Sequence, residues 1–150
     1  MVSTDTNGDS LLVAARQGSV DAVKALLDDP ETSVHKTRWS GVTALHRACE
    51  AGDIATIQVL LDHGAAVNAR STWGWYTPLH VASRYGREDA IHFLLAHGAD
   101  WNQKDKNNVT PFKYAVRAGF AAMAHRIDEA VLRAAKAEPR APNEAKSKAL

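Results

Sequence analysis

Nine glycines recur at nearly constant spacing along the 150 residues of the chain. They fall into three series with one period of 33 or 34 residues: Gly18, Gly52, Gly86 and Gly119; Gly64 and Gly98; and Gly8, Gly41 and Gly74. A fixed period of this length is typical of repeat proteins, in which one supersecondary unit is stacked on copies of itself. The period therefore predicts about four stacked units.

Each unit contains the pattern of two helices. Two dipeptides place a hydroxyl at a helix N-cap and a proline at the first helical position: Thr77-Pro78 and Thr110-Pro111. Each unit also contains a second apolar series at helical spacing, as in Ile54, Ile57, Leu60 and Leu61 of the unit that precedes Thr77. After Gly64 and Gly98 the chain is polar and has turn residues in its middle, which predicts an extended finger folded back like a hairpin.

These patterns resemble the ankyrin repeat, and the resemblance covers residues 9 to about 132. It is carried by two helix openings and two second-helix ends: Gly41 to Ala48, Thr77 to Ala82, Leu60 to Ala69 and Leu94 to Asn102. The resemblance implies an all-α fold, an ankyrin-repeat solenoid of four stacked helix-turn-helix units with hairpin-like fingers. The first and fourth units depart from the pattern toward polar residues, as expected of caps at both ends.

The chain divides into three parts on this basis. We expect a flexible N-terminus over residues 1–8 and an ankyrin-repeat domain over residues 9–137. Its four repeats are expected at about 9–40, 41–74, 75–107 and 108–137. Residues 138–150 contain two prolines and few apolar side chains, and we expect them to form a disordered basic tail.

Charge and cysteine content limit the environment and the partners. The 18 basic and 17 acidic residues give a net charge of +1, and residues 1–132 hold 13 basic against 15 acidic residues, which argues against nucleic acid as a partner. No apolar run approaches the roughly 20 residues of a membrane span. We therefore expect no membrane contact. Cys49 is the single cysteine, so we expect a cytoplasmic or nuclear protein. We also expect a monomer.

The residues that most often carry chemistry have structural explanations here. The resemblance implies that His46 and His80 bond a threonine hydroxyl and a neighbouring backbone group, which locks the turn to the helix. Cys49 follows Ala48 at a small-residue position and is expected to be a buried, inert thiol. No phosphate loop, paired-carboxylate motif or metal-ligand spacing is present. We therefore predict no catalytic residue, no metal site and no cofactor, and hence no enzyme.

Aromatic and basic residues gather at the finger positions and at the exposed ends of the first helices. In a finger, an aromatic side chain either packs against the adjacent finger or is exposed to bind a partner, and both interpretations stay open. The resemblance places these positions on one concave face, where Trp, Tyr and Arg are typical of binding hot spots. The predicted partner-binding residues are Arg38, Trp39, Glu50, Trp73, Trp75, Tyr76, Arg84, Tyr85, Lys106 and Arg117. Trp101 replaces Val67 of the preceding repeat and is expected to pack between repeats.

The leading hypothesis is a non-enzymatic protein–protein interaction module that binds a partner with acidic and apolar anchors on this face, as an inhibitor or an adaptor. The size is similar to that of four-repeat inhibitors of cyclin-dependent kinases, although residues 44–50 predict a regular helix where those have a shortened one. One alternative is a reader of methylated lysine peptides, with Trp39, Trp73, Trp75 and Glu50 as a cage. Another is a stacked nucleotide, with its base on Trp73 or Trp75 and its phosphate on Arg84 or Lys106.

Overall fold

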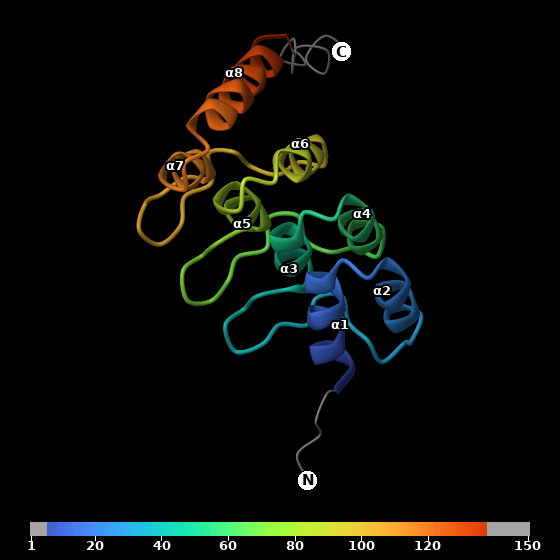
Figure 1. Ribbon diagram of the computed structural model, residues 1–150. Coiled ribbons are helices and arrows are strands. Elements are labelled where there is room, and N and C mark those ends of the chain that lie inside the picture. The colour runs from blue at the N-terminus through green and yellow to red at the C-terminus, as the bar shows by residue number, and fades with distance from the viewer. Residues whose placement is uncertain (1–5, 138–150) are drawn as a thin grey trace, which may run out of the picture.

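The computed structural model describes residues 6–137, and in this range the chain forms eight α-helices and no strand. The helices are α1 (Thr6–Gln17), α2 (Val20–Leu27), α3 (Ala44–Ala51), α4 (Ile54–Asp62), α5 (Pro78–Arg84), α6 (Glu88–Ala96), α7 (Pro111–Arg117) and α8 (Ala121–Ala137). They pair along the chain into four antiparallel units, which stack one on the next (Figure 1). The expected all-α solenoid of helix pairs is confirmed.

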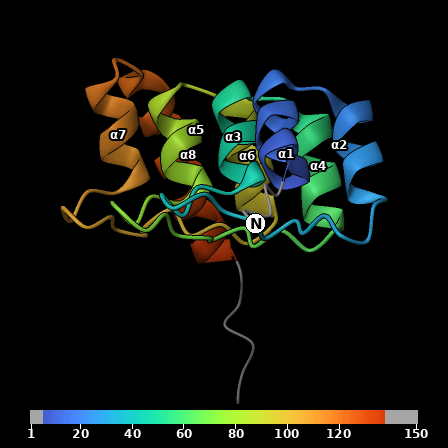
Figure 2. The same ribbon diagram turned by 90° about the horizontal axis from the view of Figure 1, so that it is seen from below.

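The helices form two layers, with the connecting fingers on one side (Figure 2). The first helices α1, α3, α5 and α7 contact one another in order, and α2, α4 and α6 do the same in the second layer. Alanines one repeat apart let the first helices approach closely, and all are buried: Ala14, Ala48, Ala82 and Ala115. Cys49 lies in the same core, where burial raises the pKa of its thiol, so the expectation of a buried thiol is confirmed.

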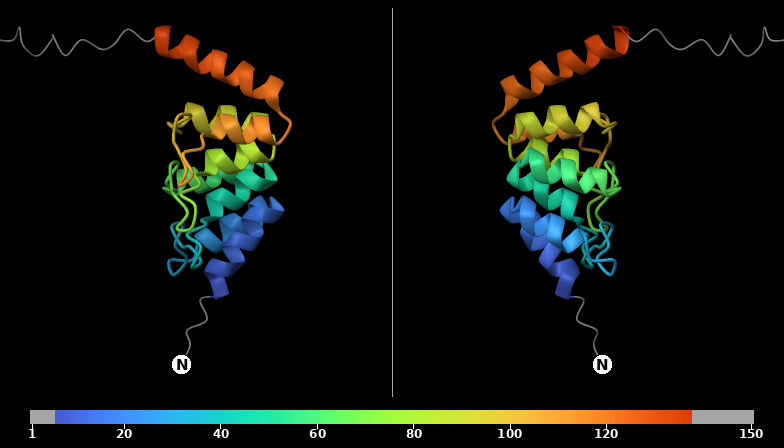
Figure 3. Two further views of the ribbon diagram at one scale, coloured as in Figure 1. Left: turned by 90° about the vertical axis from the view of Figure 1, so that its left-hand side faces the viewer. Right: turned by 90° about the vertical axis from the view of Figure 1, so that its right-hand side faces the viewer.

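The last helix departs from the stack. α8 is 17 residues long and tilts away from α6 (Figure 3). Arg126 holds it with hydrogen bonds of 2.9 and 3.0 Å to the Glu88 carboxylate, and the indole N–H of Trp101 donates to Asp128 at 3.1 Å. Trp101 is only 3% exposed, which confirms the expected packing between repeats.

The N-terminal boundary differs from the expectation. α1 begins at Thr6, so the backbone of residues 6–8, assigned from the sequence to a flexible start, is helical. Asp9 in the first turn favours this helix, because a carboxylate there opposes the positive end of the helix dipole. The expected tail, residues 138–150, lies outside the described residues.

Two threonine–histidine pairs cap the inner first helices and join neighbouring repeats. In α3 the Thr43 hydroxyl lies 2.8 Å from His46 Nδ1, and the Thr43 backbone N–H donates to the same nitrogen at 3.2 Å. Because Nδ1 accepts, the ring proton is on Nε2, which donates to the Tyr76 carbonyl at 2.9 Å. The implied bond of this imidazole to a hydroxyl and to backbone is confirmed.

The same bridge recurs one repeat later. His80 Nδ1 lies 2.8 Å from the Thr77 hydroxyl, and its Nε2 donates to the Val109 carbonyl at 3.0 Å. Tyr76 and Val109 each precede the N-cap threonine of the following helix, so each imidazole fixes the start of the next repeat. In α7, Lys113 takes the histidine position, and Thr110 caps the helix through its hydroxyl alone.

We predict that these imidazoles make stability fall in mild acid. Burial lowers the pKa of His46 to about 4, and burial also lowers the pKa of His80. In the unfolded chain both rings protonate near pH 6.5, so below that pH the unfolded state binds protons that the fold does not. The contribution of the neutral histidines to the free energy of unfolding is fully present above about pH 6.5. As the pH falls below that value, the free energy of unfolding should decrease by up to about 1.4 kcal/mol per pH unit for each histidine, until the pKa in the folded state is reached.

Urea unfolding followed by circular dichroism between about pH 7 and pH 4.5 measures this slope. His46→Gln, whose side-chain amide can still donate to the Tyr76 carbonyl, is the matched variant. It should be less stable at neutral pH and show a shallower slope. Equal slopes in the two proteins would show that His46 does not remain neutral in the fold.

Candidate functional site

The fingers are held in register by backbone hydrogen bonds. The second finger closes through the Ser71 N–H to the Tyr76 carbonyl at 2.9 Å, and its neighbour through the Asp105 N–H to the Val109 carbonyl at 3.0 Å. Between fingers, the Thr72 N–H donates to the Ser40 carbonyl (2.9 Å) and the Lys106 N–H to the Gly74 carbonyl (3.0 Å). The three fingers therefore present their tips as one fixed edge of the solenoid.

One position in each finger has a left-handed backbone, and its register differs from the one read from glycine spacing. Gly41 (φ 70°), Trp75 (φ 58°) and Asn108 (φ 63°) occupy it. The pairing of Gly41 with Gly74 across 33 residues is thus wrong by one residue. Gly74 is required for another reason, because a Cβ atom there would lie 2.2 Å from the Tyr76 ring.

Trp75 is the residue that fits this position least well. Left-handed backbone costs a bulky side chain on the order of 1–2 kcal/mol, whereas glycine and asparagine adopt it readily. The residue remains 47% exposed, and the Arg70 guanidinium lies 5.7 Å from its ring centroid. The fold therefore tolerates strain at Trp75 while leaving about half of the residue open to solvent.

Trp39 and Trp73 form a pair at the tips of the first two fingers. Their ring centroids are 5.8 Å apart with an interplanar angle of 85°, and the Trp73 indole N–H donates to the Trp39 carbonyl at 3.2 Å. The two residues nevertheless stay 80% and 68% exposed. The interpretation that the aromatic residues join adjacent fingers is confirmed, and the pair also leaves a large aromatic surface exposed.

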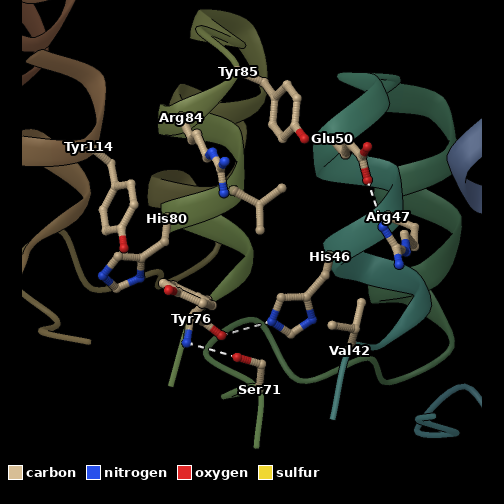
Figure 4. A pocket seen from close by; sticks show the side chains of 11 residues that line it. Val42, His46, Arg47, Glu50, Ser71, Tyr76, His80, Arg84, Tyr85 and Tyr114 are labelled. Carbon is tan, nitrogen blue, oxygen red and sulfur yellow. Dashed lines mark hydrogen bonds and ion pairs between the residues drawn. The ribbon is translucent and has the colours of Figure 1, made fainter. Parts of the chain in front are cut away.

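A pocket of about 150 Å³ opens between α3 and α5 (Figure 4). Four of the predicted site residues line it: Glu50, Tyr76, Arg84 and Tyr85. Tyr114 completes the set, so all three tyrosines of the chain meet at this pocket. Tyr76 and Tyr114 pack edge to face, with centroids 5.8 Å apart.

The charges around the pocket are unevenly paired. The Glu50 carboxylate is 16% exposed and lies 2.9 Å from the Arg47 guanidinium and 3.4 Å from that of Arg16. Arg84 also lines the pocket but has no ion-pair partner among residues 6–137. The pocket therefore combines aromatic walls with a surplus of positive charge.

Tyr114 is fixed from the third finger. Its hydroxyl donates to the Asp105 carboxylate at 2.8 Å, and burial, together with hydrogen bonds involving Tyr76 and Asp105, raises its pKa. Asp105 also accepts the backbone N–H groups of Asn107 and Val109. Although burial raises the pKa of Asp105, these hydrogen bonds outweigh it and hold that pKa below its ordinary value.

The other predicted residues lie outside the pocket. Arg38 forms two hydrogen bonds of 2.8 Å with Asp9, which lower the pKa of that carboxyl, and it borders a neighbouring hollow with Arg16. Lys106 and Arg117 are exposed and line no part of the tyrosine pocket. The ten predicted residues thus divide into a pocket group, a tryptophan group and three peripheral cations.

This division separates the residues of the methyl-lysine cage and of the nucleotide site that uses Arg84. Lys106, the other candidate for the phosphate, lies beside the second finger, where its backbone N–H donates to the Gly74 carbonyl. The pocket that Glu50 lines contains no tryptophan, and Glu50 is already paired with two arginines. The structure therefore does not assemble the expected cage for methylated lysine. Nor does it bring Trp73 or Trp75 to the pocket with Arg84, as a stacked nucleotide with its phosphate on Arg84 requires.

Three contributing residues were missed from the sequence: Arg47, Arg70 and Tyr114. Arg47, Val81 and Tyr114 stand 34 and 33 residues apart and all line the pocket. The repeat period alone could have identified this register. Arg70 gave no comparable indication, because its contact with Trp75 depends on the folded finger.

Residues 6–137 contain no group of three or more His, Cys, Asp or Glu side chains placed to hold a metal ion. No helix in this range has the length and apolar character needed to cross a membrane.

A family model of ankyrin repeats, three copies long, matches residues 11–105 and again residues 73–127. Together with the stacked helix pairs and the fingers, this match shows that the chain belongs to the ankyrin-repeat family. Ankyrin repeats are generally protein–protein interaction modules and are generally not enzymes. Comparison with curated proteins gives no match.

Trp75→Asn should leave the fold at least as stable as the original protein. Asparagine already occupies the equivalent position of the next finger, Asn108, so the change removes backbone strain. We expect the free energy of unfolding in urea to stay equal or to rise by up to about 1 kcal/mol. Trp73→Asn, which removes the ring pair without relieving strain, should instead lower it. A loss of more than about 1 kcal/mol in Trp75→Asn would show that the indole is retained for packing.

Proposed function

We propose that this protein is a non-enzymatic binding module that holds a partner protein on the surface formed by its fingers and first helices. One observation carries the proposal, the distribution of exposed large apolar side chains over the described residues. The exposed aromatic residues on the fingers and first helices are Trp39, Trp73, Trp75 and Tyr85. Among the second helices, α2, α4 and α6 contribute no exposed large apolar side chain, and α8 contributes one, Leu132. Such clustering is typical of interaction sites.

Charge on this surface favours an acidic partner. The acidic groups Asp9 and Glu50 are already paired with arginines. Three cations have no ion-pair partner among the described residues: Arg84, Lys106 and Arg117. A partner segment with carboxylates for these cations and apolar side chains for the tryptophans is complementary to both features.

A rigid surface of this kind acts by occupying part of its partner. The backbone bonds between fingers and the histidine bridges fix the surface before binding, which lowers the entropic cost of association. Covering a part of the partner makes the module an adaptor or an inhibitor, depending on which surface of the partner it covers. α3 has its full eight residues, so the shortened helix of the kinase inhibitors is absent at this place.

The proposal predicts that a paired substitution, Trp73→Ala with Arg84→Glu, abolishes partner capture. Both side chains are exposed, so the variant should fold. The purified protein, immobilised, is used for quantitative affinity capture with mass spectrometry from the source cells. A specific partner should be depleted at least tenfold by the variant, and its capture should weaken as salt screens the cations.

The matched control changes one cation and one ring on second-layer helices, Lys24→Glu in α2 with His92→Ala in α6, and both residues are exposed. Partners that bind the finger surface are retained by this control. Equal capture by the original protein and by the folded Trp73→Ala, Arg84→Glu variant would contradict the proposal.

A further inference from the structure

We infer that the tyrosine pocket between α3 and α5 receives the carboxylate of one aspartate or glutamate side chain from an acidic segment of the partner. The inference rests on the proposed function and assigns the chemistry of one subsite within it. The size of the pocket, its charges and its free hydrogen-bond donors support it.

The size of the pocket fits one side chain. Its volume of about 150 Å³ equals that of a cavity able to hold a benzene molecule. Val42, Val81 and the rings of Tyr76, Tyr85 and Tyr114 supply apolar walls for the methylene groups of such a side chain. Arg84 and Tyr85 project from α5 on the side of the pocket that faces Glu50 of α3 (Figure 4).

The charges favour an anion over a cation. Arg47 and Arg84 against Glu50 leave a surplus of one positive charge among the residues that line the pocket. Arg16, which also contacts Glu50, and Asp105, which accepts the Tyr114 hydroxyl, lie behind the wall with opposite charges. A lysine or arginine side chain entering here meets a carboxylate that two guanidinium groups already neutralise. A carboxylate meets Arg84, whose guanidinium presents its donors without a partner in the described part of the chain.

The hydroxyls point to the same ligand. Tyr114 donates its hydroxyl hydrogen to Asp105, so this hydrogen is not available to a ligand. Tyr85 lines the pocket, is 43% exposed, and makes no hydrogen bond within residues 6–137. A carboxylate can accept from both Tyr85 and Arg84, because both side chains line the pocket.

The walls are set before any ligand arrives. The Tyr76 backbone is held by the imidazole of His46 at its carbonyl and by the Ser71 hydroxyl, which accepts its N–H at 3.0 Å. Its ring lies against Gly74, where no Cβ atom can fit. With these walls fixed, binding has to order only the exposed side chains of Arg84 and Tyr85, which limits the entropic cost of holding a single side chain.

The test uses the fact that every tyrosine of the chain lines the pocket. The full-length protein labelled with 3-fluorotyrosine should show three ¹⁹F resonances, which single Tyr→Phe variants assign. The probes are N-acetyl-glutamate amide, N-acetyl-glutamine amide and N-acetyl-lysine amide at equal ionic strength. We expect a saturable shift of the Tyr85 resonance with the glutamate probe, at least tenfold weaker binding of the glutamine probe, and none of the lysine probe.

The matched pair of variants is Arg84→Gln and Arg117→Gln, which stand at the same position of consecutive first helices. The shift should be lost in Arg84→Gln and retained in Arg117→Gln. Equal binding of glutamate and glutamine, binding of lysine, retention of the shift in Arg84→Gln, or no shift up to roughly 100 mM glutamate probe would each overturn the inference.

The two proposals fail in different ways. Partner capture that depends on Trp73 and Arg84, with no response to the glutamate probe, leaves the binding module intact and removes this subsite. A response to the glutamate probe, with capture unaffected by the paired substitution, leaves the chemistry of the pocket and removes the proposed function.

Discussion

The neutral imidazole of His46 is the contact through which the local fold and the candidate site depend on each other. Its Nδ1 accepts from the cap of α3, and its Nε2 donates to the carbonyl of Tyr76, just before the next helix. One ring therefore completes a helix cap, joins two repeats and places a wall of the tyrosine pocket. Because both ring nitrogens are committed in the neutral form, protonation breaks an acceptor role that nothing else at this site fills.

The fingers show how a repeat array accommodates a residue that its own local rules disfavour. Glycine, tryptophan and asparagine occupy the same left-handed position at 41, 75 and 108. Since each repeat is stabilised by its neighbours, the array can maintain a locally unfavourable conformation in its central finger. Strain of this kind is typical of functional positions, and Trp75 lies in the same finger as Trp73 and Tyr76.

Local pattern was enough to predict the helix pairs, the threonine caps and the buried place of Trp101, because each depends on residues within a unit or on its period. The histidine bonds followed only from the resemblance to ankyrin repeats, since each of them reaches the next repeat. The pairing of Gly41 with Gly74 was wrong because spacings of 33 and 34 residues both occur. The left-handed position of the second finger is residue 75, whereas glycine at residue 74 avoids a clash with the Tyr76 ring. The separation of Glu50 from the tryptophans could not be read from the sequence. It depends on how far the fingers extend beyond the helices, and no spacing encodes that distance.

The net charge of +1 conceals an ordered distribution on the proposed binding surface. Arginines near α1 and α3 are matched by Asp9 and Glu50, whereas the cations on α5, the third finger and α7 are unmatched. Exposed charges contribute little affinity, because water and salt screen them. They do govern approach and orientation, while the aromatic rings supply most of the contact energy. If the partner is acidic, as proposed, its segment is expected to lie with its carboxylates toward α5 and α7.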